Sequence, residues 1–287
     1  MADQQVDHDQ NFKELISTFF IEFLELFVPE IASTIDPGSV KFLQQEYFVD
    51  LVEGEEKIID LLAEVKQSGE DATFLIHIEP QSTGRSIFPE RMFFYFARLH
   101  QSHRKRIYPI ALFSYDEPKK EAKSSYGVEF LGFKVLEFNF KSIQLNRLDW
   151  RDYLGRPNPV AAALMAKMKI EESDRPKVKA ECLRLMVTLK LDPAKSRLIS
   201  KFVDTYLRLN TKDEATFQAE LAKLEPQQKE KIMQAMTSWE EKGMEKGLEK
   251  ATQTIALKML RKNLDLGTIA EFTGLTIVQL QKLQDQL

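Results

Sequence analysis

The sequence is poor in several features that would assign a chain to a special class of protein. Among its 287 residues there is one cysteine, Cys182, which excludes an internal disulfide and fits a reducing cytoplasm. The chain has no uninterrupted run of about 18 apolar residues, so we expect no membrane span. Its first ten residues are polar and acidic and lack the basic and apolar regions of a signal peptide. We therefore expect a cytoplasmic protein.

Positive charge is not in excess either. The formal net charge is −4, so any surface that binds nucleic acid must be local. The phosphate-binding patterns G-x-x-x-x-G-K-S/T and G-x-G-x-x-G are absent, as are the G-x-S-x-G hydrolase motif and the H-E-x-x-H zinc motif. With 43% hydrophobic and 29% charged residues the chain has the composition of an ordinary globular protein, which excludes disorder.

Residues 11–150 mix helix and strand signals, which predicts an α/β core with a mixed sheet flanked by helices. An apolar helix is expected over 11–28, ended by Pro29, whereas 38–51 fits either a helix or a strand. IIDLLAEV and ATFLIHIE, joined by the turn QSGED, predict a β-hairpin. FPERMFFYFARLHQSHRKR (88–106) has helical spacing, YPIALFSY (108–115) is typical of a buried strand, and 127–145 predicts one or two further strands.

The remainder of the chain carries helical patterns. Residues 158–236 predict a helical region packed on or beside the core, and 237–287 predict a long helix followed by two short ones that meet at Thr273–Gly274. The last pair has the layout of a helix-turn-helix, but its second helix offers only Lys282 to DNA. We therefore favour packing or homo-oligomer formation through these helices over recognition of a DNA sequence.

The most informative stretch is FLIHIEPQS, where a buried strand ends in polar residues. Side chains two apart share one face of a strand, so Glu79 and Gln81 point the same way, as does His77. Counting back from the turn, pairing within the hairpin brings Asp60 within reach of Glu79, although sequence does not fix the register. Two carboxylates at neighbouring strand ends, with the carbonyl of Pro80, make an oxygen site suited to Mg²⁺.

A plainer interpretation stands beside this one. Acidic residues near strand ends often lie at solvated edges, and a histidine on an apolar strand is often a satisfied core residue. The spacing alone leaves both interpretations open.

The same residues resemble the PD-(D/E)XK nuclease signature, with Asp60 on one strand and Glu79-Pro80-Gln81 on the next. The chain also resembles, over nearly its whole length, the bacterial recombination-promoting nuclease (Rpn) and putative transposase family. The segments that carry this resemblance are DHDQNFKELISTFFIEFLELFVPE, IIDLLAEV, LIHIEPQS, FPERMFFYFARL, IALFSYD and IAEFTGLTIVQLQKL.

The resemblance implies roles for individual residues. Asp60 and Glu79 correspond to the metal-binding carboxylates, and Gln81 stands where the broader superfamily has a lysine. A lysine stabilises charge on the phosphate as a cation, whereas a glutamine supplies only a dipole. A further glutamate from the first helices joins the site in many related families. Glu14, Glu22 and Glu46 are the candidates, and the apolar neighbours of Glu46 favour it.

The helix after the motif carries the residues that would contact DNA. Arg91 and Tyr95 lie four apart and so share a face, where Arg91 either binds a phosphate or pairs with Glu79. A basic cluster at the end of this helix suits either the DNA backbone or a solvated helix terminus, and it comprises Arg98, Arg104, Lys105 and Arg106.

Taken together, the residues and the resemblance predict a metal-dependent DNA endonuclease that uses Mg²⁺ or Mn²⁺ and acts in recombination or element mobility. In this hypothesis Asp60 and Glu79 hold the ion, a water attacks the phosphate and Gln81 helps to place it. The alternative hypothesis is a DNA-binding or regulatory protein that keeps the nuclease fold with little or no cleavage, which the absence of the lysine favours.

Overall fold

The computed structural model describes residues 8–43, 47–49, 56–58, 61–69, 72–82, 84, 86–262 and 264–284, with the backbone alone for 47–49, 56–58, 237–251 and 271. The chain forms two compact units, Met1–Ile232 and Met233–Leu287. The first unit contains both the sheet and the helical region that follows it.

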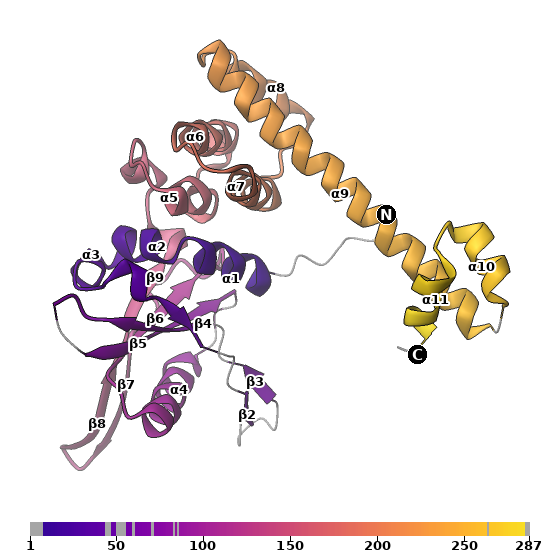
Figure 1. Ribbon diagram of the computed structural model, residues 1–287. Coiled ribbons are helices and arrows are strands. Elements are labelled where there is room, and N and C mark those ends of the chain that lie inside the picture. Colours follow the sequence, from indigo (N-terminus) through magenta and orange to yellow (C-terminus); the bar gives the residue numbers. More distant parts are fainter. Residues whose placement is uncertain are drawn as a thin grey trace. The chain divides into compact units, whose positions relative to one another are not determined.

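A mixed five-stranded sheet forms the centre of the first unit, so the predicted α/β class is confirmed (Figure 1). Its strands, in spatial order, are β1 (Lys41–Phe42), β4 (Leu61–Lys66), β5 (Thr73–Gln81), β6 (Ile107–Phe113) and β9 (Lys141–Gln144). The pairs β1–β4 and β4–β5 are antiparallel, and β5–β6 and β6–β9 are parallel. The predicted hairpin is β4–β5, with Gly69 in its turn at φ +77°. A separate two-stranded sheet pairs β2 (Tyr47–Val49) with β3 (Glu56–Ile58).

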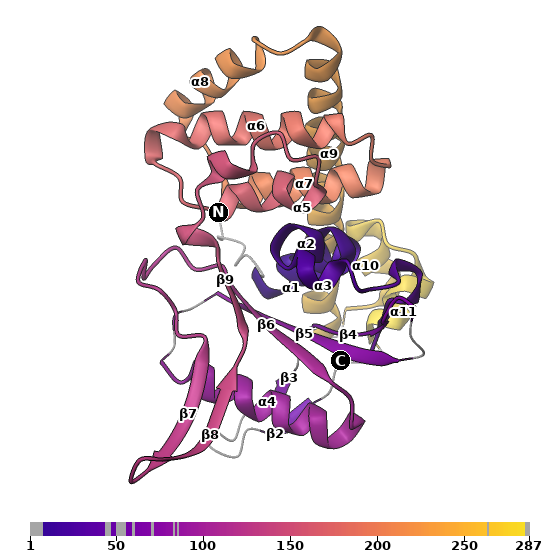
Figure 2. The same ribbon diagram turned by 90° about the vertical axis from the view of Figure 1, so that its left-hand side faces the viewer.

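Helices cover both faces of this sheet (Figures 1 and 2). Helix α4 (Phe88–His103) connects β5 to the parallel strand β6 and packs on one face, where Leu75, Met92 and Leu99 are fully buried. It begins with a proline in its first turn and ends where Arg104 adopts a left-handed conformation, three residues before the end predicted from its sequence. The N-terminal helices lie over the other face.

The predicted N-terminal helix is divided into three, namely α1 (His8–Thr18), α2 (Phe20–Phe27) and α3 (Pro29–Ala32). Phe19, at φ −123° and ψ 46°, leaves the helical conformation between the first two. Because apolar residues surround most of this segment, the break allows Phe12, Phe19 and Phe23 all to be buried. Pro29 does not simply end a helix, because it begins the short α3.

Residues 125–144 form three strands, more than the one or two predicted. β7 (Ser125–Phe130) and β8 (Phe133–Asn139) pair with each other as a hairpin outside the main sheet, and β9 then joins β6. Alternation of apolar and polar residues indicates which face a side chain occupies. It does not indicate where a chain leaves one sheet for another, so the division was not visible in the sequence.

The region that follows the sheet is mostly helical, as the sequence predicted. It comprises α5 (Pro159–Leu164), α6 (Arg175–Thr188), α7 (Pro193–Tyr206) and α8 (Thr211–Leu221), with short 3₁₀ turns at Met165–Lys167 and Glu172–Asp174. Further 3₁₀ turns lie at Pro37–Ser39, before β1, and at Leu145–Arg147 and Trp150–Tyr153, between β9 and α5. The ring of Phe12 meets that of Phe202 edge-on at 5.0 Å, and the Asn158 side chain donates to the Glu22 carbonyl at 2.8 Å. Cys182 is buried in α6, and its burial raises the pKa of the thiol well above its ordinary value.

The second unit is helical. Helix α9 (Pro226–Arg261) runs without interruption through the boundary predicted at 236/237 and across the division between the units. It is followed by α10 (Leu266–Thr273) and α11 (Ile277–Gln284), which meet at Gly274 as predicted, with φ +69°. The core of this unit contains Ala256, Leu260, Ile269 and Leu280. Among the described residues, no helix combines the length and apolar composition needed to cross a bilayer.

Candidate functional site

Three polar side chains on β5 enter the interior of the protein side by side. His77, Glu79 and Gln81 are 0%, 3% and 7% exposed. They alternate with Ile76, Ile78 and Pro80 along the strand, so they share the face that is covered by α4. Burying a carboxylate costs free energy unless it has partners, so the surroundings of Glu79 determine what this cluster is for.

Arg91, on α4, is the principal partner of both Glu79 and Gln81. Its Nη2 lies 3.6 Å from Glu79 Oε1 and also donates a hydrogen bond to Gln81 Oε1. The guanidinium carbon lies 5.1 Å from the centre of the Phe88 ring and 5.9 Å from that of Tyr95, within the range of cation–π contact. Pairing with Glu79, one of the two roles predicted for Arg91, is therefore present, and its hydrogen bond with Gln81 was not predicted.

His77 completes the cluster. Its Nε2 lies 3.4 Å from Glu79 Oε2, and its ring meets Tyr95 edge-on at 5.9 Å. Both ring nitrogens of His77, Glu79 Oε2 and Arg91 Nε are buried and have no hydrogen-bond partner among the described residues. Buried polar atoms are nearly always satisfied in folded proteins. This concentration of unsatisfied atoms is what a site that receives a ligand, a water or a further side chain would show.

Asp60 and Glu46 lie outside the described residues. The register of the hairpin is described as far as Leu61, which is paired with Ile78, the residue before Glu79. Leu62 is paired with His77 and belongs to the apolar cluster under α4. The structure therefore describes Glu79 itself and β4 as far as Leu61, the residue next to Asp60, where the sequence predicted the second carboxylate.

The described residues fit part of a site for a divalent cation. Glu79 offers a buried carboxylate with one oxygen that accepts no hydrogen bond from them, and Mg²⁺ commonly binds one or two carboxylates together with water and substrate phosphate. No group of three His, Cys, Asp or Glu side chains converges within the described part of the chain. A second carboxylate here would therefore have to come from residues outside this part, among which are the predicted Asp60 and Glu46. Pro80, buried in β5 and paired with Leu112, retains a carbonyl that can accept.

The other candidate glutamates occupy different places. Glu14 and Glu22 belong to α1 and α2, on the face of the sheet opposite α4 (Figures 1 and 2). The Glu14 carboxylate lies 3.7 Å from Lys201 Nζ on α7. In this arrangement Glu14 joins the N-terminal helices to the helical region.

The basic cluster after α4 is partly engaged in structural contacts. Lys105 Nζ contacts the Glu64 carboxylate of β4, and Arg106 Nη2 donates to Gln67 Oε1 at 3.0 Å. Arg104 is exposed at the end of the helix, and Arg98 is half-buried within it. Lys105 and Arg106 thus hold the turn between α4 and β6 against the hairpin.

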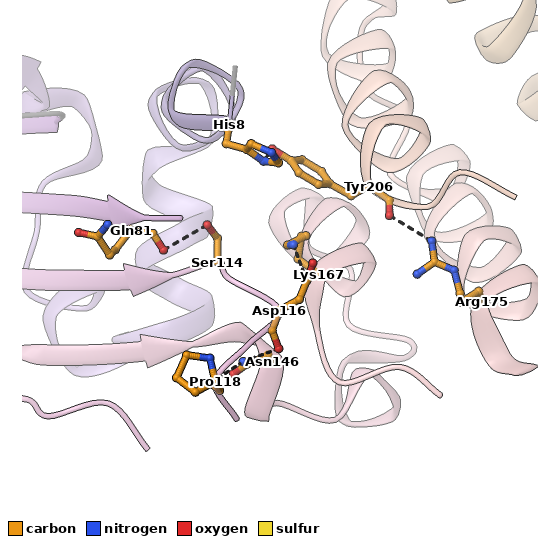
Figure 3. Close-up of polar contacts among 9 residues, drawn as sticks. All are labelled: His8, Gln81, Ser114, Asp116, Pro118, Asn146, Lys167, Arg175 and Tyr206. Carbon is orange, nitrogen blue, oxygen red and sulfur yellow. Dashed lines mark hydrogen bonds and ion pairs between the residues drawn. The ribbon is translucent and has the colours of Figure 1, made fainter. Parts of the chain in front are cut away.

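Beyond the ends of β5 and β6, polar contacts join the sheet to the helical region (Figure 3). Ser114 donates to the Gln81 carbonyl from its backbone N–H at 3.0 Å and from its hydroxyl at 3.4 Å. Two residues further on, Asp116 pairs with the nearly buried Lys167 Nζ at 2.6 Å, which lies 5.3 Å from the centre of the Tyr206 ring. Asn146 donates to the Asp116 carbonyl at 3.1 Å and fixes this loop. Of these residues, only Gln81 was among those predicted from the sequence.

The sequence predicts the strand and the shared face of these side chains, but not the hydrogen bonds and ion pairs that join them to α4. The spacing of His77 and Glu79 was the available signal for their contact, whereas nothing local linked Arg91 to Gln81. Comparisons of the chain with protein-family models, with curated proteins and with solved structures found no match.

Proposed function

We propose that this protein is a Mg²⁺- or Mn²⁺-dependent endodeoxyribonuclease of the PD-(D/E)XK type, related to the recombination-promoting nucleases. The observation that supports this most is the pair Glu79 and Gln81, buried on one face at the carboxyl end of β5 beside β4, whose first described residue, Leu61, follows Asp60 in the sequence. Burying such a polar pair costs free energy, which suggests a role beyond packing. A carboxylate and an amide at a strand end suit the binding of a cation and the placing of a phosphate.

Each residue of the cluster has a separate task in this proposal. Asp60 and Glu79, with the Pro80 carbonyl, would hold the divalent cation, which when bound polarises a phosphoryl oxygen and makes water more acidic. Gln81 orients the attacking water through its side-chain amide. His77, with its Nε2 3.4 Å from Glu79, restricts the rotation of that carboxylate. The proposal requires Asp60 to continue on the face that Leu62 occupies two residues later.

Arg91 supplies the positive charge that Gln81 lacks. In the broader superfamily a lysine at this position would stabilise the growing negative charge on the phosphate. Here the Arg91 guanidinium contacts the Gln81 side chain, so a cation is present at the corresponding place although it comes from α4. An arginine that also has an unsatisfied Nε can turn toward a phosphate and donate from two nitrogens.

A second candidate function is DNA binding or regulation without cleavage. The observation that favours it is that Arg91 already contacts both Glu79 and Gln81, so a cation and a substrate must compete with an existing ion pair. The basic residues Arg98, Arg104, Lys105 and Arg106 serve either function, because contacts with the DNA backbone are mainly electrostatic.

The nicking of supercoiled plasmid in Mg²⁺ or Mn²⁺ distinguishes these functions. Asp60→Asn and Glu79→Gln should each slow nicking by at least about a hundredfold, since each removes a charge that binds the ion. Glu220→Gln is the matched control, because Glu220 lies on α8 and pairs with Lys223, and it should nick like the wild type.

Each alternative has its own outcome. Equal nicking by all four proteins indicates a contaminating nuclease and removes the support for this site. If none of them nicks but all retain DNA in a salt-dependent manner, the non-cleaving function is correct. Absence of both nicking and DNA retention excludes both functions.

A further inference from the structure

The hairpin formed by β7 and β8 is held firmly at its base. The Tyr126 ring stacks on Phe93 at 5.6 Å, and its hydroxyl donates to Glu90 Oε1 at 3.1 Å. From the other strand, Phe138 packs against Phe96 at 5.1 Å. Both strands are thus anchored to α4, and the rest of the hairpin is carried on a rigid support.

The outer half of the hairpin exposes an apolar surface. Figures 1 and 2 show that it extends away from α4 and from the main sheet. Its exposed side chains, which we call the hairpin patch, are Val128 (40%), Phe130 (69%), Leu131 (92%), Phe133 (70%) and Val135 (55%). Phe130 and Phe133 are directly opposite in the ladder and so lie on one face. Single exposed apolar residues are ordinary, but a contiguous group of this size marks an interaction surface.

The turn of the hairpin points to the same conclusion. Leu131 and Gly132 both have positive φ, +49° and +81°, as in the two-residue turns that favour Asn-Gly. A leucine is strained in this conformation, and here its side chain is almost fully exposed. Neither folding nor solubility benefits from a leucine at this position. A contact outside the chain would explain its presence.

The strands also offer backbone groups for pairing. Within the described part of the chain, β7 and β8 form a sheet of two strands, so the outer edge of each is not paired with another strand. Exposed edges of this kind are templates for a strand from another chain. The hairpin patch therefore combines apolar contact area with directional hydrogen-bonding capacity.

We propose that the hairpin patch binds the hairpin patch of a second copy of this chain, forming a two-fold symmetric dimer. Lys134 is bonded to Glu137 at 3.0 Å, so Glu129 leaves the hairpin with one net negative charge. A single charge causes little repulsion between two apolar hairpins, whereas it disfavours a polyanion such as nucleic acid. The five side chains present on the order of 500 Å² per copy. Two copies would bury about 1,000 Å², the lower limit for a specific interface, so the dimer is weak and reversible.

Sedimentation of the full chain over a concentration series tests this proposal. The wild type should pass from monomer to dimer as concentration rises. Leu131→Asn should raise the dimer dissociation constant by at least about tenfold, because it removes the most exposed apolar side chain from the patch. Its thermal stability should not fall, since asparagine tolerates the left-handed conformation better than leucine. Leu154→Asn, at an exposed leucine outside the hairpin, is the matched control and should dimerise normally.

Three results would contradict the proposed dimer. A wild type that stays monomeric at all concentrations overturns the proposal. A dimer unaffected by Leu131→Asn and by Phe133→Ser also overturns it and directs attention to other surfaces, including the C-terminal helices. If the hairpin variants lose retention of DNA while the association state is unchanged, the patch contacts nucleic acid and the proposed occupant is wrong.

Discussion

At the scale of single residues, the chemistry available to Gln81 depends on Arg91. The amide has no charge, but the guanidinium that contacts it also lies 3.6 Å from Glu79. One largely buried arginine thus balances the charge of the carboxylate and places a cation beside the amide. While Arg91 is present, a lysine at position 81 would be electrostatically unfavourable, and in the proposed nuclease Arg91 would take its place.

Whether a cation at position 81 can replace the one at position 91 can be tested by mutation. Arg91→Ala should slow the proposed nicking by about 10²–10³-fold, and adding Gln81→Lys in that background should restore part of the rate, because the cation returns. Gln81→Lys alone should lower the thermal midpoint more than it does beside Arg91→Ala, since it places two cations together. Single-turnover rates and thermal unfolding of the four proteins measure both effects.

Two results would contradict this account. Equal changes in the thermal midpoint in both backgrounds would show that positions 81 and 91 are not coupled. Loss of nicking without any rescue, despite coupling in stability, would limit Arg91 to a structural role.

At the scale of elements, several helices begin at a residue whose side chain accepts hydrogen bonds from the first turn. Asn158, Asp192, Asn210 and Asp265 do so for α5, α7, α8 and α10. These caps satisfy backbone N–H groups that have no partner inside the helix. Because the cap of α10 is the carboxylate of Asp265, we expect the stability of this helix, in the small second unit, to fall in acid.

Hydrogen bonds from the Thr268 hydroxyl and then from its backbone N–H hold the pKa of Asp265 below its ordinary value of 3.8. The folded form therefore binds the proton less readily than the unfolded form, so the stabilisation is complete above the ordinary pKa and is lost as pH falls through the lowered one. We expect hydrogen exchange of 264–284 to accelerate relative to α6 as the pH falls from about 5 to about 2. Asp265→Asn keeps a capping oxygen and should not show this change, and the same pH dependence in both proteins would contradict the assignment.

At the scale of the whole molecule, the helical region belongs to the same unit as the sheet, whereas the C-terminal helices have a core of their own. Phe12 of α1 contacts both Phe202 and Tyr206 of α7, at ring distances of 5.0 and 5.7 Å. Ile269 is buried within the second unit. Truncating Phe12 and truncating Ile269 should therefore destabilise different units of the chain.

Phe12→Ala should lower the free energy of unfolding of the sheet and of α5–α8 together by about 3–5 kcal/mol. Ile269→Ala should lower only that of the second unit, by about 2–5 kcal/mol, because the lost contacts lie within it. Hydrogen exchange resolved by peptide measures both units in one experiment. A fall in the protection of β5 or α4 in Ile269→Ala would show that the two units unfold as one.

The sequence by itself determined the β4–β5 hairpin, the helix α4, the helical nature of the region after the sheet and the turn at Gly274, because periodicity and turn residues act locally. It also determined that His77, Glu79 and Gln81 share a face. Only the tertiary structure decided that Arg91 contacts Gln81, that Phe19 divides the first helix and that residues 125–144 form three strands across two sheets. Local pattern fixes the face on which a side chain lies, whereas packing between distant segments selects its partner.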